Sequence, residues 1–142
     1  MNEVRSQKSE VRMWTLWLLG TLLIAPSLAP AQEGHPLVGT WHGTWGVNDK
    51  NRNDITLVMT WDGKQIGGMI NPGLSAGKLQ NASLNPDGWQ VHFEADMKDA
   101  SGAMVHVTAD GKLTNITNVR RGLSGAWSQG SQKGDFQLKR DN

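Results

Sequence analysis

The side chains with the chemistry of metal ligands are His92, Glu94 and His106. His92 and Glu94 share one parity in "WQVHFEA", and His106 lies in the next alternating stretch, "AMVHVTA". If the two stretches form a hairpin, the histidines lie side by side on its outer face. Two histidines and a carboxylate can bind zinc, but polar side chains are ordinary on an exposed strand face. We therefore predict no metal and no cofactor, with His92 and His106 as the candidates if a metal binds.

The chain shows no arrangement of serine, histidine and aspartate that is typical of a nucleophilic centre, such as a nucleophile elbow. Asp54, Glu94 and Asp96 form no obvious pair of general acid and general base. We therefore predict no catalytic residue and no enzyme activity. A barrel isomerase-type enzyme is kept as the third alternative.

Tryptophan gives the stronger indication of a binding site. Five tryptophans follow residue 31, and strand parity places each on an apolar face: Trp41, Trp45, Trp61, Trp89 and Trp127. The interior of an eight-stranded barrel is just wide enough to be filled by side chains or to hold one small ligand. The indoles therefore either fill the interior or line a pocket. We predict an apolar ligand site made of these residues: Trp45, Trp61, Trp89, Phe93 and Trp127.

Apolar residues alternate at period two between glycine-rich turns, which is the pattern of short strands. The first strand is "LVGTWHGTWG", residues 37–46, because two glycines inside a helix would cost about 1 kcal/mol each. About nine strand candidates follow one another, and Asp110–Gly111 is among the predicted turns. Short strands joined by tight turns predict an all-β, up-and-down antiparallel barrel of about eight strands.

The opening Gly39-Thr40-Trp41, the sequential hairpins and the ending "LSGAW…GDFQLKR" resemble the lipocalin-type, or calycin, barrels. The paired Gly-x-Trp motifs and the "G-x-F-x-L-x-R" ending are most similar to the short exported lipocalin-like domains of bacteria. The resemblance implies that Trp41 packs under Arg140 and that this pair closes one barrel end. Parity agrees, since Phe136, Leu138 and Arg140 share one face.

The first 31 residues have the features of a cleaved signal peptide. A basic start precedes the apolar run "MWTLWLLGTLLIAPSLA", and Ala29-Pro30-Ala31 predicts cleavage before Gln32; an uncleaved membrane anchor is the alternative. We expect a secreted or periplasmic protein whose residues 32–142 form one barrel domain that is not embedded in a membrane. Acidic and basic side chains balance beyond residue 31, which argues against a nucleic-acid partner.

The expected function is binding of a small apolar or amphipathic molecule inside the barrel. The alternative is a protein-interaction or inhibitor module with a filled barrel. In that case the segment "VNDKNRND", residues 47–54, would be the contact surface. A cavity that opens to solvent would favour the first function, and a filled barrel would favour the second.

Overall fold

The computed structural model describes residues 34–141; the predicted signal peptide and its cleavage site lie outside the described residues. The described part consists of eight strands joined by turns and loops. Their bounds are β1 Gly39–Gly46, β2 Arg52–Trp61, β3 Ile66–Ile70, β4 Gly77–Asn85, β5 Gln90–Lys98, β6 Met104–Thr114, β7 Gly122–Gln129 and β8 Gln132–Arg140. Within residues 34–141 there is no helix of the length and apolarity needed to cross a membrane.

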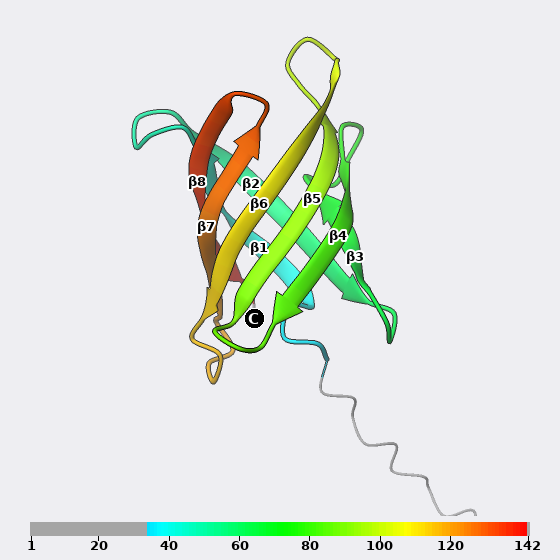
Figure 1. The fold of residues 1–142 in the computed structure, drawn as a ribbon, viewed down its shortest axis with the longest axis vertical. Helices are drawn as coiled ribbons and strands as arrows, with labels where there is room; N and C mark the ends of the chain where they lie inside the picture. The colour runs from blue at the N-terminus through cyan, green and yellow to red at the C-terminus, as the bar shows by residue number, and fades with distance from the viewer. Residues whose placement is uncertain (1–33, 142) are drawn as a thin grey trace, which may run out of the picture. The chain divides into compact units, whose positions relative to one another are not determined.

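Each strand pairs antiparallel with the next, and β1 also pairs with β8, so the sheet closes into a barrel (Figure 1). At the closing seam Trp41 lies opposite Arg140, and Gly46 lies opposite Asp135. The predicted up-and-down architecture and the pairing of the first strand with the last are confirmed. Because each strand has a neighbour on both sides, the barrel carries its own closed core and leaves no sheet edge unpaired.

The two ends of the barrel carry different loops. One end, the closed end, carries the start of β1, the β6–β7 loop and the end of β8. The other end, the open end, carries the β1–β2, β3–β4 and β5–β6 loops and the β7–β8 turn (Figure 1). Leu37, just before β1, and Trp41 are fully buried at the closed end.

Side chains that point inward alternate with side chains that point outward, as expected for strands. On β5 the inward residues Val91, Phe93 and Ala95 are buried, and on β8 the same holds for Phe136 and Leu138. No polar or charged residue is buried in the described part of the chain. The fully buried core of this part is therefore built from apolar side chains.

The predicted turn at Asp110–Gly111 is wrong, because β6 runs through it without a break. Gly111 lies opposite Val91 on β5 and opposite Gly125 on β7. A Cβ atom at residue 111 would lie 2.6 Å from the Ser124 carbonyl oxygen and 2.9 Å from Cζ of Phe136. This glycine thus permits a close approach between strands rather than a change of chain direction, and two predicted strands become one.

Candidate functional site

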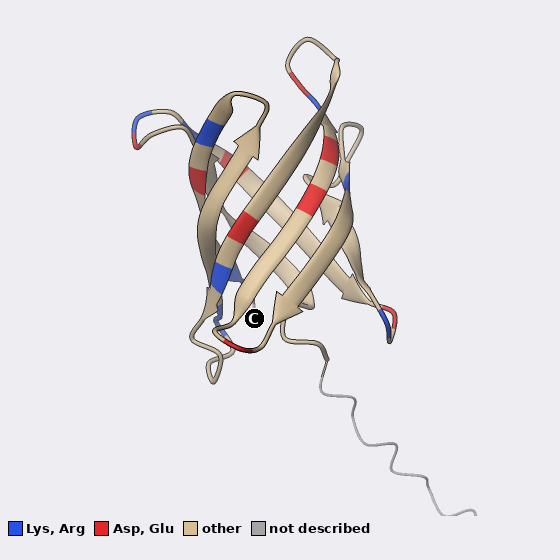
Figure 2. Cartoon of the chain, in the orientation of Figure 1, with Lys and Arg blue, Asp and Glu red and all other residues tan. Residues whose placement is uncertain are grey.

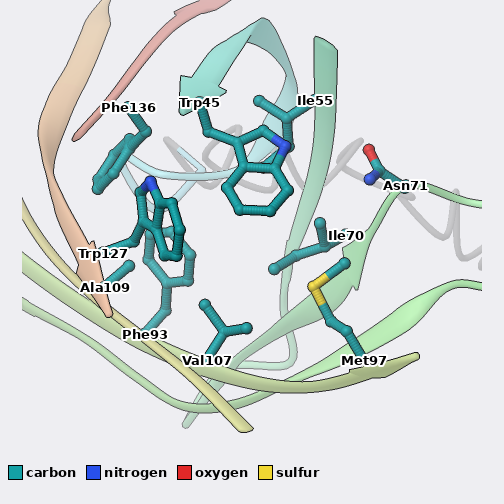
Figure 3. Close-up of a pocket in the computed structure, with 10 residues that line it drawn as sticks. All are labelled: Trp45, Ile55, Ile70, Asn71, Phe93, Met97, Val107, Ala109, Trp127 and Phe136. Carbon is teal, nitrogen blue, oxygen red and sulfur yellow. The ribbon is translucent and has the colours of Figure 1, made fainter. Parts of the chain in front are cut away.

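An apolar cavity lies inside the barrel near its open end (Figure 3). Seven of the eight strands contribute to its wall, and one residue comes from the β3–β4 loop. The lining residues are Trp45, Ile55, Ile70, Asn71, Phe93, Met97, Val107, Ala109, Trp127 and Phe136.

Aromatic rings form one side of the cavity. The rings of Trp45 and Trp127 meet edge to face, with centroids 4.7 Å apart and planes at 73°. Phe93 and Phe136 meet in the same manner at 5.8 Å and 65°. The Trp127 indole N–H donates to the carbonyl oxygen of Asp135 at 3.2 Å, which anchors this ring to β8. Figure 3 shows Met97 and Ile70 on the side facing these rings.

Asn71 is the polar side chain of this cavity wall, and its carbonyl is already engaged. The side-chain Oδ1 of Asn71 accepts a hydrogen bond from the backbone N–H of Thr56 at 3.0 Å. The backbone N–H of Asn71 donates to the backbone carbonyl of Thr56 at 2.7 Å. A ligand therefore meets mainly carbon and sulfur atoms, so burial of apolar surface must supply its binding free energy.

The cavity is small, with a volume of about 30 Å³. A single water needs roughly 10–15 Å³ on this measure, and an engineered cavity of about 150 Å³ takes up benzene. The rings thus fill most of the interior and leave a slot for a thin group only. Of the lining side chains, the unbranched thioether of Met97 is the one best able to adapt its shape.

The predicted ligand residues separate into two groups. Trp45, Phe93 and Trp127 line the cavity. Trp61 lies at the far end of β2, is 39 % exposed and stacks on His35 with centroids 4.7 Å apart. Trp89 lies in the β4–β5 turn with φ of 55°, so it does not belong to a strand and its parity gives no direction.

Several lining residues were absent from the predicted site. Ile55, Val107 and Phe136 had the correct parity for the interior, but parity does not indicate at which height of the barrel a residue lies. Ile70 and Asn71 reach the cavity because β3 is short and ends at this height. No pattern within the sequence indicated that contribution.

At the closed end, Arg140 lies opposite Trp41 in the strand register, and packing of Arg140 on the Trp41 indole stays a prediction. Its guanidinium donates two hydrogen bonds to the Val119 carbonyl, from Nε at 3.3 Å and from Nη2 at 3.1 Å. Its Cγ and Cδ atoms lie over Gly39, where a Cβ atom would approach them to 3.1–3.3 Å. Arg140 therefore holds the β6–β7 loop against the barrel end, while the Trp41 indole donates to the Leu37 carbonyl at 2.9 Å.

Both histidines of the metal hypothesis lie on the outer face, but not side by side. His92 is paired across the strands with Asp110, and His106 with Asp96. Each Nδ1 lies 2.7 Å from an oxygen of its paired aspartate. The expected position was wrong because the loop of residues 99–103 joins the strands with Lys98 opposite Met104, and this register places His92 opposite Asp110.

Glu94 lies between the two imidazoles and completes a polar ladder across β4, β5 and β6. Its Oε1 is 3.4 Å from Nε2 of His106 and 4.0 Å from Nε2 of His92, and its Oε2 accepts from Asn81. Acidic bands on β5 and β6 mark this ladder in Figure 2. Asp96 and Glu94 raise the pKa of His106, while Asn81 and then His106 lower the pKa of Glu94. Across residues 34–141, no three histidine or carboxylate groups are arranged to hold a metal ion.

Scans of this chain against protein-family models, curated proteins and solved structures found no match.

Proposed function

We propose that this domain, as an exported protein, binds a thin apolar group such as the alkyl end of an amphipathic molecule. The observation that carries the proposal is the apolar cavity at the open end of the barrel. The position agrees with the resemblance to lipocalin-type barrels, in which the interior takes up small ligands. The aromatic side would contact the chain, and the polar head of the ligand would remain outside the barrel.

The size of the cavity restricts the ligand. A rigid ring of benzene size exceeds the available volume of about 30 Å³. An alkyl chain is narrower than a ring, so its methyl end can enter the cavity while the rest of the chain stays outside. Each methylene that leaves water contributes about 0.8 kcal/mol. Rotation of Met97 about its three side-chain bonds would lengthen the slot without displacing the aromatic rings.

The test uses dodecanoate below its micelle concentration, with tryptophan fluorescence and calorimetry as readouts. Met97→Ala enlarges the cavity and should tighten binding, whereas Ala109→Val fills it and should weaken binding about tenfold. Met69→Ala is the matched control, because Met69 is 41 % exposed and lies outside the cavity. Saturable binding that is unchanged in Ala109→Val would place the ligand elsewhere and contradict the proposal.

The second candidate is the interaction module with a filled barrel, and the small cavity volume is the observation that favours it. Its contact surface would include the β1–β2 loop, in which Oδ1 of Asn48 accepts hydrogen bonds from the N–H groups of Lys50 and Asn51. Complete absence of saturable dodecanoate binding to both the wild type and Met97→Ala would support this candidate instead.

A further inference from the structure

Three large apolar side chains are exposed at the open end, in or directly after the β1–β2, β3–β4 and β5–β6 loops. Val47 follows β1 and is 48 % exposed, Leu74 lies in the β3–β4 loop and is fully exposed, and Met104 begins β6 and is 62 % exposed. We refer to these three side chains as the open rim. All three loops lie at the same end of the barrel (Figure 1).

The loops of the open rim lie close in sequence to residues that line the cavity. Asn71 lines the cavity and stands three residues before Leu74 in the same loop. Met97 lines the cavity at the end of β5, and the loop that follows leads to Met104. Trp45, one residue before the end of β1, lines the cavity two residues before Val47. Each of the three loops therefore follows a strand end, or begins at a residue, that lines the cavity.

The open end carries side chains of both charges, and one pair of them forms an ion pair. Nη1 of Arg52 lies 2.7 Å from Oδ1 of Asp135. Asp99 accepts hydrogen bonds from the N–H groups of Ser101 and Ala103 and from the Ser101 hydroxyl, which orders the β5–β6 loop. Both signs of charge are present in the β1–β2 loop, at Asp49 and Lys50 (Figure 2). A surface with apolar tips and balanced charge matches a zwitterionic interface better than an anionic one.

We propose that the open rim docks on the surface of a zwitterionic lipid bilayer, with Leu74 and Met104 entering the interface. The docked orientation turns the open end, which holds the cavity, toward the acyl chains, so a chain can pass between lipid and barrel. This second step rests on the proposed function, whereas the docking itself does not. The driving force is the removal of the fully exposed Leu74 side chain from water.

The test is co-flotation of residues 32–142 with phosphatidylcholine vesicles. Leu74→Asp and Met104→Asp should each weaken vesicle binding about tenfold or more. Val119→Asp is the matched control, since Val119 is 65 % exposed but lies in the β6–β7 loop at the closed end. Binding of the wild type should persist at high salt, because apolar contact and not charge carries it.

The outcomes separate docking from ligand binding. Vesicle binding by the wild type that is lost equally in Val119→Asp, or no vesicle binding at all, would overturn the docking. Self-association in lipid-free solution that Leu74→Asp abolishes, without vesicle binding, would assign the rim to contact between copies of this chain and also overturn it. Leu74→Asp should still bind dodecanoate in lipid-free solution. Vesicle binding without dodecanoate binding would refute the proposed function alone.

Discussion

Arg140 stabilises the closed end through two kinds of contact. Its guanidinium donates to the Val119 carbonyl, and its aliphatic carbons pack over Gly39 at the start of β1. Burial and the neighbouring Arg121 both lower the pKa of Arg140, which reflects the crowding of this end. Arg121 itself donates to the carbonyls of Ile116 and Pro36, so two arginines hold the same loop.

Replacement of Arg140 by alanine should lower the free energy of unfolding by about 1–2 kcal/mol, because one carbonyl loses its donors and the packing over Gly39 is lost. Lysine at this position keeps the charge but lacks the two guanidinium N–H donors to the Val119 carbonyl. Arg140→Lys should therefore lower the free energy of unfolding by less than Arg140→Ala does. Chemical denaturation measures both effects. Lys139→Ala, on the exposed face of β8, is the control and should change stability by less than about 0.5 kcal/mol. Equal midpoints for the two alanine variants would make Arg140 an ordinary surface residue.

The strands β4, β5 and β6 are joined on their outer face by the polar ladder. Gln80 on β4 donates to Asp96 at 2.8 Å, Asp96 pairs with His106 on β6, and Glu94 bridges His106 and Asn81. Lys78 lies opposite Asp96 on β4, while Thr108 and Asp110 are the other outward residues of this part of β6. Hydrogen bonds to the carboxylates favour the protonated imidazole of His106 and the ionised forms of Glu94 and Asp96.

The ladder predicts a dependence of stability on pH. The pKa of His106 is raised, so its contribution is complete below its unfolded value of 6.5 and is lost as pH rises through the folded value. His106→Gln should therefore lower the unfolding midpoint more at about pH 5.5 than at about pH 8. Glu94 and Asp96 have lowered pKa values, so their contribution disappears at still lower pH.

His35→Gln is a control for which the change in stability should depend on pH in the opposite direction. Burial lowers the pKa of His35, so the wild-type imidazole costs stability as pH falls, and its removal should be better tolerated in acid than in base. If the difference between the wild type and His106→Gln were the same at both pH values, the ladder would have no influence on the titration of His106.

The molecule as a whole depends on the seam between β1 and β8, since this pairing alone joins the first strand to the last. His42 and Lys139 are paired across the seam and both are exposed. The chain has no cysteine, so a double replacement by cysteine introduces one defined pair. The disulfide should form under mild oxidation and stabilise the barrel by about 2–4 kcal/mol, because it closes a long loop.

The control for the seam replaces His42 and Lys112 by cysteine. Lys112 also lies on the outer face, but β7 and β8 separate β6 from β1, so this pair is too distant for a disulfide. Mass spectrometry and denaturation with and without reductant distinguish the two variants. Oxidation of the control with no oxidation of the first pair would contradict the closed barrel.

Local patterns were sufficient for the architecture. Alternation of apolar residues, glycine and asparagine turns, and the absence of a long crossover segment required an up-and-down barrel, and the parity of Phe93 and Trp127 placed them inside it. Parity succeeds because a strand has only two faces, and the interior of a closed barrel takes one of them.

Register, height and shape came from the tertiary structure. Gly111 has the sequence signature of a turn, yet packing against Phe136 and the β7 backbone keeps it within β6. The β5–β6 loop sets which side chains oppose His92 and His106, so the two histidines lie opposite aspartates and form a ladder with Glu94 instead of facing each other. Trp61 and Trp89 share the chemistry of Trp45, but the barrel end and a left-handed backbone remove them from the cavity. The volume left between the rings depends on all inward side chains at once, and no stretch of sequence encodes it separately.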